Sequence, residues 1–147
     1  MSKVVLLDAG PLGMVTHPRK NPEIKAWLQQ LLRRGVVVMV PEIADYEVRR
    51  ELLRAGKRKG VARLDALKTA IGYVPLTTET MLKAAEFWAE ARRQGQPTAD
   101  DKALDGDVIL AAQVVTMKRR GDDMIVATTN VGHLGRFVEA KNWQAIT

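Results

Sequence analysis

The chain has 147 residues, of which 46% are hydrophobic and 27% charged, so we expect one soluble globular domain over residues 1–147. The absence of cysteine excludes disulfides, thiolate metal ligands and cysteine nucleophiles, and fits a cytoplasmic protein. No apolar run approaches the roughly 18 residues that span a bilayer, and the first apolar run is too short for a signal peptide, so no membrane partner is expected. The net charge of +6 makes nucleic acid the first candidate partner.

Short apolar runs alternate with amphipathic segments along the whole sequence. Runs rich in β-branched residues predict four strands and an optional edge strand, over 4–7, 36–40, 73–76, 124–128 and 143–146. Apolar side chains at helical spacing predict helices over about 22–35, 41–55, 61–71, 78–95 and 108–117. Glycine, proline and polar residues predict loops over 9–13 and 96–103. This order predicts an α/β fold with three layers and a mostly parallel central sheet.

One stretch, 104–115, combines two carboxylates with a nearly unbroken apolar run. Apolar residues at 108, 111, 112 and 115 follow helical spacing, and the residues between them are mostly apolar too, so this helix should be largely buried. Asp105 and Asp107 stand just before the run, where the helix dipole favours anions. Two carboxylates are more than one cap requires. We therefore expect this helix to hold an acidic site in place.

Other oxygen-bearing side chains are expected at the same edge of the sheet. Asp8 ends the first predicted strand, Asn130 follows the fourth, and Glu47 lies about two turns into the helix after the second. Functional groups of parallel sheets gather beyond the carboxyl ends of the strands. Crowded carboxylates raise one another's pKa unless a cation neutralises them, and an all-oxygen set selects Mg²⁺ or Mn²⁺. An acidic site on a basic protein suggests metal-dependent hydrolysis of a phosphodiester.

Each of these residues also has a simpler interpretation. Asp8 alone is more often a cap or loop acceptor, and Glu47 alone is most simply a salt-bridge partner of Arg50 or Arg54. The basic run 57–59 is more often a solvated surface than an RNA clamp. The two histidines have no partner at metal-ligand spacing, so no chemistry is assigned to them. Only the combination of acidic residues favours a site.

The motifs of several other α/β proteins are absent. The sequence has no G-x-G-x-x-G dinucleotide fingerprint, no G-x-x-x-x-G-K-[ST] phosphate loop and no G-x-S-x-G elbow. A haloacid-dehalogenase-like phosphatase would have a second aspartate two positions after Asp8, where this chain has Gly10. A phospho-acceptor receiver domain would need an acidic pair and a third-strand aspartate that are not visible. These absences leave the metal-dependent hydrolase.

The ordered set of motifs resembles a PIN domain, with VapC-type toxins of toxin–antitoxin pairs as the nearest pattern. The resemblance spans essentially the whole chain. It is carried by the sequence VVLLD ending at residue 8, the helical Glu47, the pattern D-x-D-x-x-L-A-A over 105–112 and ATTN over 127–130. It implies a parallel sheet flanked by helices, and an endoribonuclease that uses Mg²⁺ or Mn²⁺ held by three or four acidic residues. It also implies a homodimer and a small antitoxin that can occlude the acidic groove.

Carried over by position, the resemblance assigns a role to each residue of the set. Asp8, Glu47 and Asp107 would be catalytic metal ligands, and Asp105 an auxiliary ligand or a hydrogen-bond acceptor behind them. The fourth site, acidic in many members, is Asn130 here, which offers a carbonyl oxygen but one negative charge fewer. Tight binding of a second metal ion is therefore in doubt.

The remaining predictions concern RNA. Arg50 and Arg54 share the Glu47 side of their helix and are the candidate RNA contacts. The leading hypothesis is a metal-activated water attacking an RNA phosphodiester in line. One alternative is a PIN-like RNA-binding module without catalysis, suggested by Asn130 and the positive charge. Another is an interaction protein whose acidic groove docks a basic peptide.

Overall fold

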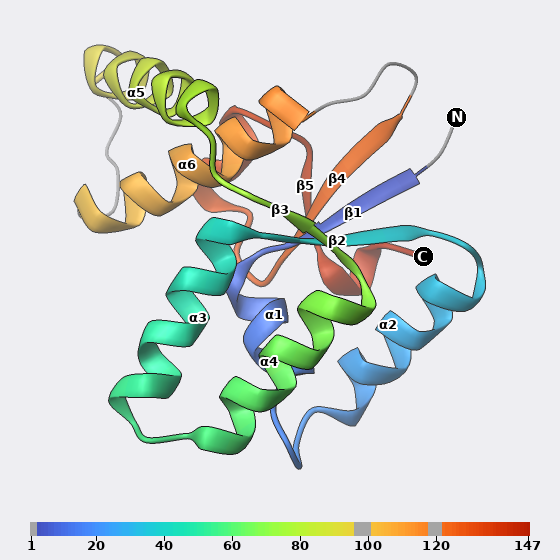
Figure 1. Cartoon of the computed structure of the whole chain (residues 1–147). Helices are drawn as coiled ribbons and strands as arrows, with labels where there is room; N and C mark the ends of the chain where they lie inside the picture. The colour runs from blue at the N-terminus through green and yellow to red at the C-terminus, as the bar shows by residue number, and fades with distance from the viewer. Residues whose placement is uncertain (1–2, 96–100, 118–121) are drawn as a thin grey trace.

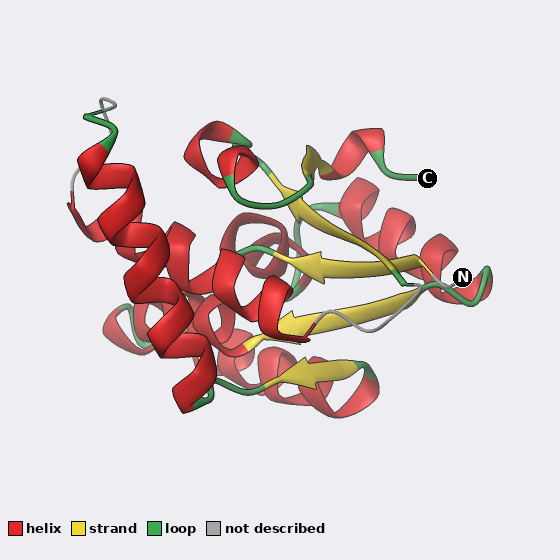
Figure 2. Ribbon diagram, turned by 90° about the horizontal axis from the view of Figure 1, so that it is seen from above, coloured by secondary structure: helices red, strands yellow, loops and turns green. Residues whose placement is uncertain are grey.

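The computed structural model describes residues 3–95, 101–117 and 122–147, apart from the side chains of 101–103 and 133. Its centre is a five-stranded sheet in the order β3-β2-β1-β4-β5, in which every neighbouring pair is parallel. The long strands point the same way in Figure 2. The strands are β1 (Lys3–Leu7), β2 (Val37–Pro41), β3 (Gly72–Val74), β4 (Asp123–Thr128) and β5 (Ala140–Asn142). The predicted α/β class is confirmed.

Helices cover both faces of the sheet and make the outer two layers (Figure 1). One face packs against four helices: α1 (Ala9–Val15), α2 (Pro22–Arg33), α3 (Glu42–Arg54) and α4 (Arg58–Ala70). The other face packs against α6 (Asp101–Met117) and the short helix η1 (Gly132–Arg136), with α5 (Thr78–Arg93) outside α6. Among the described residues, no helix is both long and apolar enough to cross a membrane.

The central strand β1 explains why both faces need a cover. Val5 and Leu7 belong to the core beneath α1–α4, whereas Val4 and Leu6 belong to the core beneath α6. All four side chains are 0% exposed. A strand that is apolar at every position can be buried only between two layers, so β1 fixes the middle of the molecule.

Two expected loops are partly helical in the structure. Residues 9–13, read as a Gly/Pro loop, form most of α1 because Asp8 caps it: its Oδ1 accepts the N–H of Ala9 at 2.8 Å. Pro11 stands in the first turn, where a missing N–H breaks no helical hydrogen bond. The predicted loop 96–103 is also wrong at its end, since α6 begins at residue 101, and the rest of it lies outside the described residues. Asp105 and Asp107 therefore lie inside α6 rather than before it.

The optional edge strand was placed a few residues late. β5 occupies Ala140–Asn142, and the predicted residues 143–146 contain the short helix η2 (Trp143–Ala145) instead. The indole of Trp143 packs edge-on against Trp27 of α2, and Trp27 Nε1 donates to the carbonyl of Ile146 at 2.7 Å. This segment is apolar because it closes the core under α2, not because it extends the sheet.

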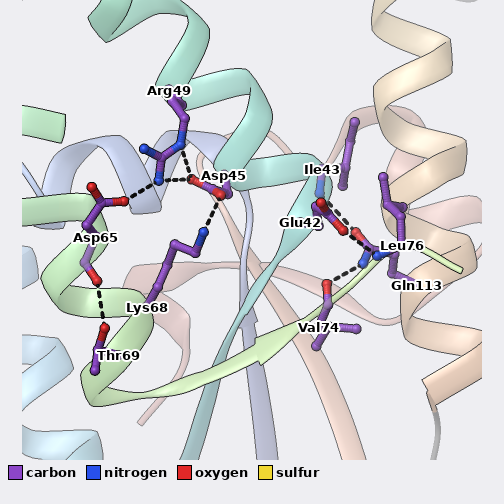
Figure 3. Close-up of polar contacts among 10 residues, drawn as sticks. All are labelled: Glu42, Ile43, Asp45, Arg49, Asp65, Lys68, Thr69, Val74, Leu76 and Gln113. Carbon is purple, nitrogen blue, oxygen red and sulfur yellow. Dashed lines mark hydrogen bonds and ion pairs between the residues drawn. The ribbon is translucent and has the colours of Figure 1, made fainter.

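Two buried polar side chains hold neighbouring helices and strands in place through hydrogen bonds and ion pairs (Figure 3). Asp45 of α3 is 5% exposed and bonds Arg49 and Lys68, which ties α3 to α4. Gln113 of α6 is 0% exposed; its Oε1 accepts the Ile43 N–H at 3.1 Å and its Nε2 donates to the Val74 carbonyl at 2.7 Å. Gln113 thereby joins α6 to the start of α3 and to β3.

Candidate active site

The first carboxylate stands where β1 ends. Asp8 is half-buried and both of its oxygens are engaged: Oδ1 accepts the N–H of Ala9, and Oδ2 accepts the hydroxyl of Thr128 at 2.8 Å. The cap explains why the chain turns into α1 at this point. Asp8 is thus both the cap, as its simpler interpretation held, and a fixed carboxylate.

Thr128 is a residue that the sequence reasoning missed. The parallel register pairs Leu7 with Ala127, so Asp8 and Thr128 come level at the carboxyl ends of β1 and β4. Thr128 is 1% exposed, and its Oγ1 accepts the N–H of Asn130 at 3.1 Å while donating to Asp8. The signal was present in the motif ATTN, in which only the asparagine was considered. The hydroxyl links Asp8 to Asn130 in one network.

This position is a switch point of the sheet. From β1 the chain moves to β2 on one side, and β4 lies on the other side of β1. The helix after β1 lies on one face of the sheet and η1 after β4 on the other, and open parallel sheets bind ligands beyond the strand ends at such a point. Asp8, Thr128 and Asn130 lie at this end of the sheet.

The second carboxylate comes from α3. Glu47 is half-buried, and its pKa is raised to about 6 by burial first, then by repulsion from Asp8 and Asp107, against an opposing effect of Arg50. Its alternative role as an ion-pair partner is not supported for Arg54, which bonds Glu51 instead. The guanidinium of Arg50 lies 5.1 Å from the centre of the Tyr46 ring. Arg50 therefore neutralises the Glu47 carboxylate only in part, and Asp8 and Asp107 repel it.

The third carboxylate comes from α6. Asp107 is half-buried, and burial followed by repulsion from Asp8 raises its pKa to about 6. The preceding residue, Gly106, faces Glu47: a Cβ there would stand 2.9 Å from Glu47 Oε2. The glycine lets α3 and α6 approach closely enough to bring their carboxylates together.

The structure thus brings together three of the four predicted acidic residues. The repulsion on Glu47 comes from Asp8 and Asp107, and Asp105 is exposed on α6 and takes no part in it. Asn130 is exposed and joins the group through Thr128. The ligand and catalytic roles themselves stay predictions.

The donor set can be tested against the divalent cation that the sequence predicted. Three carboxylates and an amide are oxygen donors of the type that Mg²⁺ and Mn²⁺ prefer, and the raised pKa values of Glu47 and Asp107 mark negative charge in need of a cation. As the side chains stand, no three His, Asp or Glu residues in the described ranges converge closely enough to hold an ion. The chemistry of the set fits a divalent cation, and holding one requires the carboxylates to close together.

Comparison with known proteins gives structural matches alone. No protein-family model and no curated protein matches the sequence. A chain of the VapBC2 complex of Rickettsia felis, solved with a promoter DNA fragment, has a TM-score of 0.74 at 12% identity, with 95% of this chain and 98% of that chain covered. FitAcB of Neisseria gonorrhoeae gives 0.68 at 19% identity, with 97% and 99% covered.

A single toxin chain is also similar. VapC20 of Mycobacterium tuberculosis, described as a sarcin–ricin loop cleaving toxin, has a TM-score of 0.61 at 16% identity, with 92% of this chain and 97% of that chain covered. Identities this low establish the fold and not the activity. The chain has the three-layer fold of VapC-type toxins, as its resemblance to PIN domains predicted.

Proposed function

We propose that this protein is a Mg²⁺- or Mn²⁺-dependent endoribonuclease. The observation that carries the proposal is that Asp8, Glu47 and Asp107 lie within electrostatic range of one another near the switch point of the sheet, where burial and repulsion raise the pKa values of two of them. The fold supports it, because a sarcin–ricin loop cleaving toxin has the same arrangement of strands and helices at 16% identity. The net charge of +6 supports a polyanionic substrate.

Different residues of the chain would have different roles in such a site. Asp8, Glu47 and Asp107 would hold the cation, whose chemistry is to activate a water molecule and to screen the phosphodiester charge. Thr128 fixes the orientation of Asp8 through a 2.8 Å hydrogen bond. Arg50 lies beside Glu47, where its guanidinium can contact a phosphate next to the scissile bond. Arg54 is the weaker candidate for RNA because Glu51 already pairs with it.

The partners belong to the same proposal. The similar structures include VapBC and FitAcB complexes, and this supports a small antitoxin as the partner that covers the three carboxylates. A homodimer follows from the resemblance and is tested by the mass of the purified protein in solution. The cytoplasm is the compartment that this proposal requires.

The deciding experiment measures cleavage of a mixed pool of structured RNA in Mg²⁺, Mn²⁺ or EDTA. Asp107→Asn should abolish metal-dependent cleavage. Asp105→Asn is the matched control, because it makes the same substitution two residues away on an exposed part of α6 and should cleave like the wild type. Equal cleavage by wild type and Asp107→Asn would contradict the proposal.

A second candidate function is RNA binding without cleavage. It is favoured by Asn130, which removes a charge from the site, and by the separation of the three carboxylates as they stand. A well-folded wild type that binds RNA and cleaves none in either metal would decide for it.

A further inference from the structure

A hollow that none of the three carboxylates lines lies at the C-terminal end of α1. It has a volume of about 550 Å³, within the range of ligand-binding pockets. Its walls come from the end of α1, the residues that follow it, and the turn between α3 and α4, which lie at the same end of the molecule in Figure 1. The residues around it are Gly13, Thr16, His17, Pro18, Arg19, Leu52, Gly56, Lys57, Arg58, Lys59 and Gly60.

Exposed, positively charged side chains surround this hollow. Arg19, Lys57, Arg58 and Lys59 line it, and no acidic residue does. Within the described ranges, none of these four cations forms an ion pair, although partly buried cations elsewhere on this side of the sheet do, such as Lys68 with Asp45. Four unpaired cations around one hollow repel one another, so an anion bound there would be stabilised.

His17 lines the hollow, and the surrounding positive charges affect its pKa. Its pKa is lowered by desolvation first and then by the positive charges of Lys20, Lys25, Lys57 and Arg19. Its Nδ1 accepts two backbone N–H groups, from Arg19 and Lys20, each at 3.1 Å. An imidazole that accepts at Nδ1 and is held neutral adds no competing charge, and its titration will respond to any anion that enters.

The first turn of α4 supplies neutral donors in the N–H groups of Lys59 and Gly60, whereas the N–H of Arg58 already bonds the Gly56 carbonyl at 3.1 Å. α4 begins at Arg58, and its N-cap, Lys57, gives the first turn no side-chain acceptor. Helix N-termini carry free N–H groups that suit a phosphate. Gly60, in that first turn, is needed for close packing, because a Cβ there would stand 2.9 Å from Leu52 Cδ2.

The hollow also has an apolar side. Leu52 and Pro18 are among its lining residues. A flat ring can lie against such side chains while an attached phosphate reaches the lysines. A bare inorganic anion would leave this part of the hollow unused.

We propose that this hollow binds a nucleotide of the RNA substrate, with its phosphate at Lys57 and Lys59 and its base or ribose against Leu52 and Pro18. The inference rests on the proposed function and extends it. α1 connects the two sites, with Asp8 as its N-cap and Thr16 as its C-cap, eight positions or about 12 Å apart along the axis. An RNA strand of a few nucleotides can span that distance. The basic run 57–59, expected to be a solvated surface, then has a binding role.

The test measures binding separately from cleavage. A fluorescein-labelled single-stranded oligoribonucleotide is titrated with protein in EDTA, at several salt concentrations, and followed by anisotropy. Lys57→Gln with Lys59→Gln should weaken binding on the order of tenfold and make the dependence of log K on log[salt] shallower by about 1.4, as expected for two lost phosphate contacts. Arg33→Gln with Arg34→Gln is the control, since it removes the same charge from exposed residues at the far end of α2.

The NMR titration of His17 identifies the ligand. Addition of the oligoribonucleotide should raise the pKa of His17, because the phosphate offsets the surrounding positive charge. Adenosine monophosphate is added in a second arm: the same rise shows that the hollow takes a free nucleotide as well, and no rise shows that it needs an RNA strand.

Two results would overturn the inference: equal loss of RNA binding in the control and the lysine variant, or no response of His17 to either ligand. These results are distinct from failure of the proposed function. If the wild type cleaves no RNA but loses RNA binding when Lys57 and Lys59 are replaced, the binding role of the hollow is supported and the nuclease function is contradicted. If the wild type cleaves RNA and its RNA binding does not depend on the two lysines, the nuclease function is supported and the role of the hollow is contradicted.

Discussion

Oε2 of Glu47 lies 2.9 Å from the point where a Cβ on Gly106 would stand, so α3 and α6 meet at the site across a glycine. The contact places a residue of low helix propensity in the second turn of α6. The glycine weakens the helix and makes room for a carboxylate.

Gly106→Ala should therefore separate stability from function. Alanine favours the helix by about 0.5–1 kcal/mol, and the end of the Glu47 side chain can swing aside, so the melting temperature should hold or rise. The displaced carboxylate should weaken Mn²⁺ binding and lower RNA cleavage on the order of 10²-fold. Gly13→Ala is the control for melting temperature and Mn²⁺ affinity, because its Cβ would have an ordinary 3.9 Å contact with Val48. Unchanged Mn²⁺ affinity in Gly106→Ala would contradict the role given to Glu47.

The raised pKa values of Glu47 and Asp107, both about 6, predict the pH dependence of stability. The folded protein binds these protons more tightly than the unfolded chain, in which such carboxyls titrate near about 4. The free energy of unfolding that these groups contribute therefore falls as the pH rises from about 4 through 6. Thermal melts in EDTA should show wild type losing stability over this window relative to Glu47→Gln. Parallel curves for the two proteins would contradict the prediction.

Added metal should reverse this trend. A divalent cation competes with protons for Glu47 and Asp107, so the rise in melting temperature on adding Mn²⁺ should grow as the pH passes about 6. The acid side of the cleavage profile should follow the same titration. Asp105→Asn should keep the Mn²⁺ effect, whereas Asp107→Asn should lose most of it. A Mn²⁺ shift that does not vary with pH would place the ion elsewhere.

The hydroxyl of Thr128 should contribute more to stability and activity than the volume of its side chain. Thr128→Val keeps the volume but leaves Asp8 Oδ2 and the Asn130 N–H without their partner, at a cost of about 1–2 kcal/mol in urea unfolding. Loss of support for a metal-binding carboxylate costs about 10–100-fold in affinity or activity, and cleavage should fall within that range. Thr128→Ser restores the hydroxyl and should recover most of the activity. Failure of serine to do so would assign the effect to packing.

Gln113 should be a determinant of stability. Gln113→Leu leaves the Ile43 N–H and the Val74 carbonyl buried without partners, so urea unfolding should show a loss of about 2–4 kcal/mol. Gln30→Leu makes the same change on an exposed position of α2 and should alter stability little. Similar losses in the two variants would show that the buried amide does not brace α6.

Local patterns predicted the fold well and the site in part. The apolar runs of β1, β2 and β4 could be located because buried parallel strands are apolar at every position. α1 was missed because glycine and proline suggest a loop, and only the cap from Asp8 makes them helical. The start of α6 was missed because its first two turns contain four charged residues and a glycine, with Leu104 as the one large apolar side chain, which is buried.

The candidate site, too, could be predicted from local patterns only in part. Asp8, Glu47 and Asp107 could be named from residue type and order, whereas the exposure of Asp105 outside this group depends on which side of α6 faces α3. Thr128 became visible only through the register of β1 and β4. Charge alone could not distinguish a solvated lysine run from one that lines a hollow, because that depends on where the α1–α2 connection passes.

The hydrogen bond between Thr128 and Asp8 joins residues 120 positions apart. A ribosome makes Thr128 120 positions after Asp8. β4 must then insert beside β1 before the hydroxyl reaches the carboxylate. The support of Asp8 is thus completed only after Thr128 has been synthesised, and any activity that depends on it begins no earlier.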